Sequence, residues 1–431
     1  MDSEKLLFYE ALLQQLHDDD LEDAAASIKQ KLKIEPNGLL RRNHLFDLFR
    51  NNAYLSSRVV AAAGGSDVQT AENAYELRLQ DVLDEAHQSS APQDKPYRLT
   101  GFAPFCDFPT YRPCRCVAES HDGSLMATAG AGGALHVIPT MPANGEAIRR
   151  KPNWQNTTRL QGHQEQIDAI DFHPRRNIIA SGGAGCNILI HDVSIANGFV
   201  HSVTDIQRLS DSSQIRCLRF HPCGDFLVVG TSSPVVRLYD ITTRACYTSN
   251  QSRRQHQGGS INGCDVLHTG GLIFTAGDDG SILMWDGKNL DVLRTMEGVH
   301  GGSPVLSVRC EKYGRYLTSS GQDGTTKVTD LRMMRELTSV GRVSRGVMRA
   351  SSDFMFNSRF VTTFSVVQTG RRVTNEVLVY CVDTGSQEAD ISSIMGRAAV
   401  FDVLASKHDM ALYLLIDDSS CKVISFFEPP A

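Results

Sequence analysis

The stretch Phe274-Thr275-Ala276-Gly277-Asp278-Asp279-Gly280-Ser281-Ile282-Leu283-Met284-Trp285-Asp286 decides the fold that the sequence predicts. Its pattern is that of two short apolar strands joined by a tight turn, and it ends in the dipeptide Trp-Asp. This ending recurs along the chain, so the stretch is one copy of a repeat. The aligned endings are Ile190-His191-Asp192, Leu238-Tyr239-Asp240 and Val328-Thr329-Asp330, with Tyr380-Cys381-Val382-Asp383 as a looser copy.

The final aspartates of these copies lie 44 to 53 residues apart. Two further units, at 125–138 and 399–427, bring the number of units to seven. A single four-stranded sheet is unstable alone, whereas a radial arrangement buries both faces of each sheet against its neighbours. The period and the Trp-Asp ending resemble those of WD40 repeats. We therefore expect an all-β, seven-bladed WD40 β-propeller at 113–431.

The last unit offers only three strands, at 398–404, 412–416 and 422–427. A closed ring needs a fourth strand in that blade, because an open edge would be left unpaired. The segment at 99–108, which precedes the first unit, is the predicted donor of that strand.

The first fifty residues differ from the rest, because their apolar residues recur at three- and four-residue spacing. The prediction is a small α-helical domain at 1–53, too small to bury its apolar faces alone. We expect the domain to bury these apolar faces by self-association. The alternative is that they pack on the rest of the chain. The residues expected at the dimer interface are Leu6, Leu12, Leu13, Leu16, Ile28, Leu32, Leu45 and Phe49. An acidic, flexible linker is expected at 54–112.

Several His and Asp residues recur at the blade spacing, which favours a structural role over acid–base or metal chemistry. Within a blade, a His, a turn Asp, a strand Ser or Thr and the Trp can form a hydrogen-bonded chain that fixes the turns. The fifth unit has Thr329 in place of Trp, and the second has Gly185 in place of the Asp. The residues predicted for this network are His163, His256, Thr275, Asp279, Trp285, His300 and Asp323.

The composition favours a protein–protein scaffold and contains no recognisable catalytic motif. The chain has 431 residues and 35 glycines. Its net charge is −6, so binding to the phosphate backbone of a nucleic acid is not its expected main role. No P-loop, dinucleotide-binding loop, HExxH or GxSxG motif occurs, and we expect no enzyme activity, cofactor or metal. Two Gly-rich stretches, Gly130-Ala131-Gly132-Gly133 and Gly182-Gly183-Ala184-Gly185, fit turns between strands better than phosphate cradles.

The N-terminal sequence does not resemble a signal peptide, and no apolar run is long enough to cross a membrane. The 11 cysteines are scattered, which predicts a reducing compartment, the cytosol or the nucleus. Basic doublets such as Arg175-Arg176 and Arg253-Arg254 fall in expected loops. They are either ordinary solvated charge or, if several share one rim, a surface for acidic or phosphorylated peptides or for RNA.

The third unit carries a more specific resemblance. The stretch Ile215-Arg216-Cys217-Leu218-Arg219-Phe220-His221-Pro222-Cys223-Gly224-Asp225-Phe226-Leu227, with Arg237-Leu238-Tyr239-Asp240-Ile241, resembles the WD-repeat subunit of the cleavage stimulation factor. Pro113-Cys114-Arg115-Cys116 and Ser319-Ser320-Gly321-Gln322-Asp323 resemble the first and fifth blades of that family. The plan of a helical N-terminus followed by seven repeats is also similar. Blades six and seven match only loosely.

This resemblance implies a non-catalytic nuclear scaffold in pre-mRNA 3′-end cleavage and polyadenylation. It implies a homodimer formed through the N-terminal helices and a propeller that docks on the large helical-repeat subunit. Contact with the RNA-binding subunit, and with RNA itself, would be indirect. A role near the C-terminal tail of RNA polymerase II is also implied, and no membrane is involved.

The alternative is a WD40 substrate receptor of a ubiquitin ligase. Thr329-Asp330-Leu331-Arg332 resembles the WDxR element of such receptors but lacks its Trp. Packing at the end of a strand is the simpler explanation of these four residues.

Overall fold

The chain divides into two compact units, Met1–Glu72 and Asn73–Ala431, and every residue described below belongs to the second. The predicted helical domain at 1–53 and its eight interface residues lie outside the described residues. The computed structural model describes residues 99, 101–109, 113–142, 150–152, 154–196, 199–249, 256–355, 358–370, 372–395, 399–408, 411–416 and 420–427.

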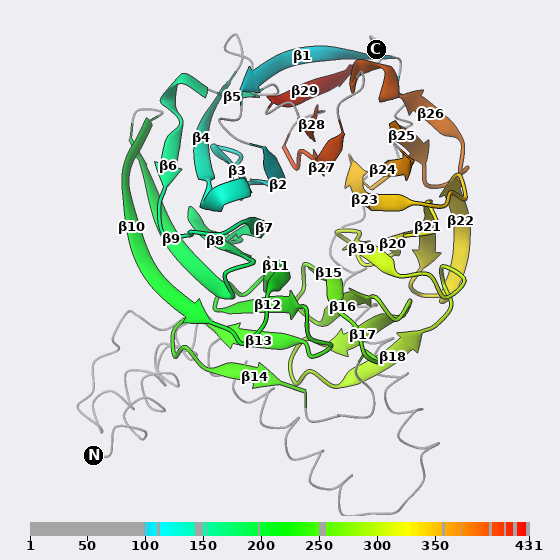
Figure 1. Ribbon diagram of the computed structural model, residues 1–431, viewed down its shortest axis with the longest axis horizontal. Helices are drawn as coiled ribbons and strands as arrows, with labels where there is room; N and C mark the ends of the chain where they lie inside the picture. Colours follow the sequence, from blue (N-terminus) through cyan, green and yellow to red (C-terminus); the bar gives the residue numbers. More distant parts are fainter. Residues whose placement is uncertain are drawn as a thin grey trace, which may run out of the picture. The chain divides into compact units, whose positions relative to one another are not determined.

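The described strands form seven antiparallel sheets arranged as the blades of a ring, which confirms the predicted propeller (Figure 1). We number the blades along the chain and give the strands of each from the channel outward. Blade 1 contains β2 (Cys114–Glu119), β3 (Leu125–Gly130), β4 (Leu135–Pro142), β5 (Arg150–Pro152) and β6 (Thr158–Leu160), the last two both pairing with β4. Blade 2 contains β7 (Ile167–Phe172), β8 (Ile178–Gly183), β9 (Asn187–Ala196) and β10 (Phe199–Ser210). Blade 3 contains β11 (Ile215–Phe220), β12 (Phe226–Thr231), β13 (Arg237–Asp240) and β14 (Cys246–Thr248).

The remaining blades follow the same plan. Blade 4 contains β15 (Ile261–Val266), β16 (Leu272–Gly277), β17 (Ile282–Asp286) and β18 (Val292–Met296). Blade 5 contains β19 (Val305–Cys310), β20 (Tyr316–Gly321), β21 (Thr325–Asp330) and β22 (Arg335–Gly341). Blade 6 contains β23 (Val347–Met355), β24 (Phe360–Thr369), β25 (Arg372–Cys381) and β26 (Gln387–Asp390). Blade 7 contains β27 (Val400–Ala405), β28 (Ala411–Ile416), β29 (Ser420–Phe427) and β1 (Gly101–Pro109).

The core of the propeller lies between neighbouring sheets. Phe274 of blade 4 and Leu317 of blade 5 belong to one buried cluster, and Met126 of blade 1 and Tyr413 of blade 7 belong to another. The second strands β3, β8 and β16 are buried at every position, because both of their faces pack on a neighbouring blade. This explains why these strands are continuous apolar or small-residue runs rather than alternating ones.

The ring closes through a strand contributed from ahead of blade 1. β1 pairs antiparallel with β29, from Gly101 opposite Phe427 to Pro109 opposite Ser420. This confirms the predicted closure by the segment at 99–108. The segment that we assigned to a linker, 54–112, therefore includes one propeller strand, which covers the edge of β29 that would otherwise be unpaired.

Blade 2 departs from the repeat at its outer edge. The sequence pattern places the end of its third strand at Asp192, yet β9 continues to Ala196 and pairs with the long strand β10. The extension is apolar on one side, where Ile195, Val200 and Val203 pack on the cluster that blades 1 and 2 share. That partly buried apolar face explains why the strand continues beyond the aspartate.

The Gly-rich stretches lie at turns between strands, where chains approach closely. A Cβ atom on Gly183 would lie 2.1 Å from the carbonyl oxygen of Gln166, and one on Gly130 would lie 2.4 Å from that of Pro113. Only glycine fits such an approach. Among the described residues, the helical segments are short 3-10 turns such as η1 (Ala131–Gly133), η3 (Trp154–Asn156) and η5 (Ser392–Met395), and none is a helix that could span a membrane.

Candidate functional site

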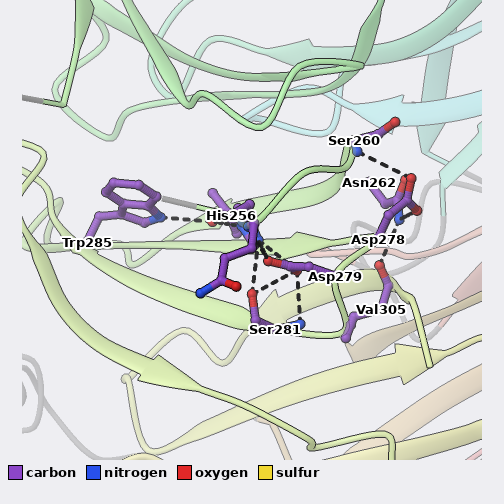
Figure 2. Close-up of polar contacts among 10 residues, drawn as sticks. His256, Ser260, Asn262, Asp278, Asp279, Ser281, Trp285 and Val305 are labelled. Carbon is purple, nitrogen blue, oxygen red and sulfur yellow. Dashed lines mark hydrogen bonds and ion pairs between the residues drawn. The ribbon is translucent and has the colours of Figure 1, made fainter. Parts of the chain in front are cut away.

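Blade 4 contains a chain of hydrogen bonds that links its strands to its turns (Figure 2). Trp285 Nε1 donates to Thr275 Oγ1 at 2.8 Å, and Thr275 Oγ1 lies 2.9 Å from His256 Nε2. His256 Nδ1 lies 3.0 Å from Asp279 Oδ1, and Asp279 also accepts from the Gln257 and Ser281 backbones. The structure therefore brings together His256, Thr275, Asp279 and Trp285 of the predicted set.

The Asp279 carboxylate can only accept, so His256 Nδ1 carries a proton and donates to it. Trp285 Nε1 can only donate, so Thr275 Oγ1 accepts from it. In the neutral imidazole, His256 Nε2 accepts from the Thr275 hydroxyl. Burial alone would raise the pKa of Asp279, but the bonds from His256, Gln257 and Ser281 hold that pKa well below its usual range. The imidazole and carboxylate are satisfied internally, which is the arrangement of a structural group.

Blades 5 and 2 contain reduced versions of this chain. His300 Nδ1 lies 3.2 Å from Asp323 Oδ1 and His300 Nε2 lies 2.9 Å from Ser319 Oγ, while Thr329 occupies the Trp position. In blade 2, His163 Nε2 lies 2.9 Å from Ser181 Oγ. Gly185 replaces the aspartate there, and burial lowers the pKa of His163 to about 4. His163 is therefore neutral at physiological pH.

Blade 3 uses different residues for the same purpose. Tyr239 stands at the Trp position and its hydroxyl donates to Asp211 Oδ2 at 2.5 Å. Arg237 Nε lies 3.0 Å from the same carboxylate, and Arg237 Nη1 donates to Thr231 Oγ1. Asp211 is almost fully buried, so its charge needs both partners. Sequence analysis missed this network, because its aspartate comes from the loop before the blade rather than from the turn.

The aspartates that end the repeats act as turn caps. Asp330 Oδ1 accepts from the backbone of Arg332 and Met333, and Asp240 Oδ1 accepts from the backbone of Thr242 and Thr243 in the same way. Leu331 is fully buried beside this turn. The resemblance of 329–332 to a WDxR element therefore has a structural explanation at the end of β21.

Carboxylates on the inner strands join one blade to the next. Asp171, Asp265 and Asp353 accept backbone N–H bonds from the following blades, at Phe220, Cys310 and Ala405. Across the closure, Asp402 of blade 7 accepts from Val117 of blade 1 at 3.1 Å, and Glu119 of blade 1 accepts from Ser406 Oγ at 3.0 Å. These bonds fix the positions of the inner strands around the channel.

The inner strands of all seven blades line a central cavity of about 550 Å³. Its charged lining residues are five arginines and two aspartates: Arg115, Arg216, Arg219, Arg309, Arg349, Asp168 and Asp402. Arg219 is paired, because its guanidinium lies 3.2 Å from Asp171 and 3.6 Å from Asp265. Burial raises the pKa of Asp402 to about 6. The cavity is therefore a polar channel in which arginines lie among the carboxylates of the inner strands, such as Asp171, Asp265 and Asp353.

These inner-strand charges follow a signal that sequence analysis did not use. The fifth residue of four successive inner strands is charged: Asp171, Arg219, Asp265 and Arg309. A charged residue at one fixed place in strands that are mostly apolar marks a position close to the channel, and β7 and β11 carry a second charge at Asp168 and Arg216. Arg115 occupies the second place of its inner strand, as Asp168 and Arg216 do in theirs. Arg349 and Phe401 had no such periodic charge signal.

The described residues contain no group of three His, Cys, Asp or Glu side chains placed to hold a metal ion. Cys114 and Cys116 are buried in the first blade. Burial raises the pKa of the Cys116 thiol well above its ordinary value, so this thiol remains protonated and packs as an apolar side chain. The geometry of the described residues thus provides an internally bonded frame around a polar channel.

The fold defines the class of protein: a seven-bladed β-propeller whose repeats are similar to WD40 repeats. The family model described as "WD domain, G-beta repeat" matches residues 154–192, 203–240, 248–286 and 291–330. The fold is also that of the Cps50 (Swd1) β-propeller domain of Myceliophteria thermophila, with a TM-score of 0.57 and 12% identity over 77% of this chain and 99% of that one.

The curated relatives include a cleavage stimulation factor subunit and two proteins named for the splicing or processing of pre-mRNA. Cleavage stimulation factor subunit 50 of Arabidopsis thaliana is 31% identical over 209 residues, which is 48% of each chain. Pre-mRNA-splicing factor cwf17 of Schizosaccharomyces pombe is 28% identical over 41% of this chain and 49% of its own. Pre-mRNA-processing factor 19 of Oryza sativa is 23% identical over 49% of this chain and 38% of its own. The chain thus spans about half the length, or less, of these relatives.

Proposed function

We propose that this protein is a non-catalytic scaffold subunit in mRNA processing, and specifically in the 3′-end cleavage and polyadenylation of pre-mRNA. The observation that carries the proposal is the 31% identity with a cleavage stimulation factor subunit. The splicing and pre-mRNA-processing names of two further relatives support the broader assignment. Nuclear localisation follows from the same assignment.

The geometry of the propeller supports a scaffold rather than an enzyme. The His and Asp residues of blades 4 and 5 are bonded to each other and to strand hydroxyls, so they are occupied in holding the blades. A ring of seven blades around a channel lined by charged side chains presents several separate surfaces to partners. Function on such a fold resides in those surfaces.

The proposed partners are the large helical-repeat and RNA-binding subunits of the cleavage stimulation factor, with the RNA polymerase II C-terminal tail as a further one. The propeller would dock on the helical-repeat subunit, so that contact with RNA is indirect. The N-terminal residues at 1–53 would form the homodimer. These assignments rest on the resemblance of the third blade and on the related subunit from Arabidopsis thaliana.

Affinity purification from nuclear extract of the source organism tests the proposal. The tagged full-length chain should recover subunits of the cleavage and polyadenylation machinery after a stringent wash. Recovery of a ubiquitin-ligase adaptor without those subunits would replace the proposal with the substrate-receptor function. A matched bait with Arg332→Ala, in the WDxR-like segment, should recover the same polyadenylation factors as the unaltered chain.

A further inference from the structure

Two cysteine side chains from neighbouring blades meet at the wall of the channel. Cys217 lies on β11 of blade 3 and Cys264 lies on β15 of blade 4, and these inner strands pack against each other (Figure 1). The two side chains are in hydrogen-bond contact. The Cys217 sulfur also lies 3.9 Å from the carbonyl oxygen of Ile261 at the start of β15. We call Cys217 and Cys264 the thiol pair.

A glycine on the neighbouring strand makes room for this contact. Gly230 on β12 is the register partner of Cys217. A Cβ atom on Gly230 would lie 2.5 Å from the Cys217 sulfur and 2.6 Å from the Cγ2 atom of Ile261. Because glycine has no Cβ atom, the Cys217 sulfur can lie between the two blades and against β15.

The thiol pair can be reached from the channel by a small molecule. Both residues line the central cavity of about 550 Å³. Cys217 is half-buried, whereas Cys264 is buried. The contact with Cys217 and burial both raise the pKa of Cys264 well above its ordinary value, so Cys264 stays a protonated thiol at neutral pH. Reaction with an oxidant that enters the channel therefore begins at Cys217.

We propose that the thiol pair is a reversible oxidation site, at which hydrogen peroxide converts Cys217 and Cys264 into a disulfide between blades 3 and 4. The Cys217 sulfur attacks one peroxide oxygen and the O–O bond breaks, which gives a sulfenic acid and one water. The Cys264 sulfur then attacks the Cys217 sulfur, the S–O bond breaks, and the hydroxyl leaves as a second water. The two thiols lose two electrons and two protons, and the peroxide gains them.

The reducing compartment that the sequence predicts determines how such a site behaves. Disulfides in these compartments are mostly transient and respond to oxidants. Small thiols that enter the channel reduce the bond again by thiol–disulfide exchange. The disulfide therefore joins two blades only while an oxidant is present. This site goes beyond the scaffold assignment and does not depend on the complex that the propeller joins.

Mass spectrometry of the full-length chain tests the site. The reduced, dilute protein is treated with hydrogen peroxide, blocked with N-ethylmaleimide in denaturant and digested without reductant. A peptide pair that joins Cys217 to Cys264 should appear, and it should disappear after dithiothreitol. Recovery of both residues as maleimide adducts would overturn the proposal. So would recovery of Cys264 as the adduct with Cys217 oxidised to a sulfinic acid or joined to a different cysteine.

Thermal unfolding detects the crosslink independently. Oxidation should raise the midpoint of the full-length chain by about 5 °C, because a disulfide between two blades restricts the unfolded chain. Cys217→Ala and Cys264→Ala should each abolish this rise, while Cys246→Ala, at an exposed cysteine on β14, should keep it. Should Cys264→Ala fail to fold, Cys217→Ala, at the half-buried member of the pair, provides the same test. An equal rise in folded Cys217→Ala would overturn the proposal, as would loss of the rise in Cys246→Ala.

Discussion

Asp279 shows how a single carboxylate holds a blade. It accepts from His256, from Gln257 N and from both the backbone and the hydroxyl of Ser281. Replacing it with alanine leaves these donors without their acceptor. Asp278, its exposed neighbour, bonds Ser260 and Asn262 at the surface and serves as the control (Figure 2).

We expect Asp279→Ala to lower the free energy of unfolding at pH 7 by about 2–3 kcal/mol, and Asp278→Ala by less than about 1 kcal/mol. The pKa of Asp279 is lower in the folded protein than in the unfolded chain, so its charge stabilises the fold above about pH 4 and that benefit is lost as the pH falls further. Urea unfolding of the wild type and both variants at pH 7 and below pH 4 measures this. Equal costs for the two alanine variants would contradict the network.

Cys223 stands where blade 1 has Asp122. Asp122 Oδ1 accepts from the backbone of Ser124, and Cys223 Sγ accepts from the backbone of Asp225 at 3.4 Å in the same kind of turn. The Sγ atom also lies 3.0 Å from His221 Nδ1. Burial alone would raise the pKa of this thiol, but the bond to His221 brings it below its ordinary value.

Cys246 provides an internal comparison, because it is exposed and burial of its sulfur still raises its pKa. We expect iodoacetamide to alkylate Cys223 faster than Cys246 near pH 7.5, since the thiolate is the reacting species. Peptide mass spectrometry over time gives both rates. The His221→Gln variant should lower the alkylation rate of Cys223 and leave that of Cys246 unchanged. If Cys246 were alkylated faster than Cys223 in the wild type, the imidazole would not activate Cys223.

At the scale of elements, the repeat alone predicted the ring and its closure. The turn at Gly277–Gly280 and the ending at Trp285 set the register of blade 4, and the missing fourth strand of the last unit pointed to β1. The extension of β9 could not be predicted, because it depends on contacts between blades 1 and 2. The network of blade 3 could not be predicted either, because Asp211 comes from the loop before the blade and not from the turn where the repeat places its aspartate.

The strand β1 gives a prediction for closure. A chain that begins at residue 97 keeps β1, whereas one that begins at residue 113 leaves the edge of β29 unpaired. We expect the shorter chain to melt more than about 5 °C below the longer one, as the loss of a few kcal/mol from a domain of this size implies. Circular dichroism melting of the two truncations and the full chain measures this. Identical midpoints for the two truncations would contradict closure by β1.

Asp402 makes the junction of blades 7 and 1 sensitive to pH. Its folded pKa of about 6 exceeds the value of about 3.9 expected in an unfolded chain, so the folded state binds the proton more tightly. Stability contributed by this group is therefore present at low pH and is lost as the pH rises through 4 to 6. In Asp402→Asn this loss should be absent, so the wild type should lose stability relative to the variant over that window. Urea unfolding at four pH values tests this, and a difference that does not change with pH would disprove it.

At the scale of the whole molecule, the blades form a ring, and charged side chains of the inner strands line its central channel. The structural roles of His256, Asp279 and Asp330 could be predicted from their repetition. The contact of Arg115 and Arg349 with the Phe401 ring could not, because these residues come from blades 1, 6 and 7 and meet only when the ring closes.

The central claim is that the propeller serves pre-mRNA 3′-end cleavage as a scaffold, and a depletion experiment tests it most directly. Nuclear extract of the source organism would be immunodepleted of this protein and assayed for cleavage of a labelled pre-mRNA substrate. The account predicts that cleavage is lost on depletion and restored by the purified full-length chain. Full cleavage in the depleted extract would contradict it.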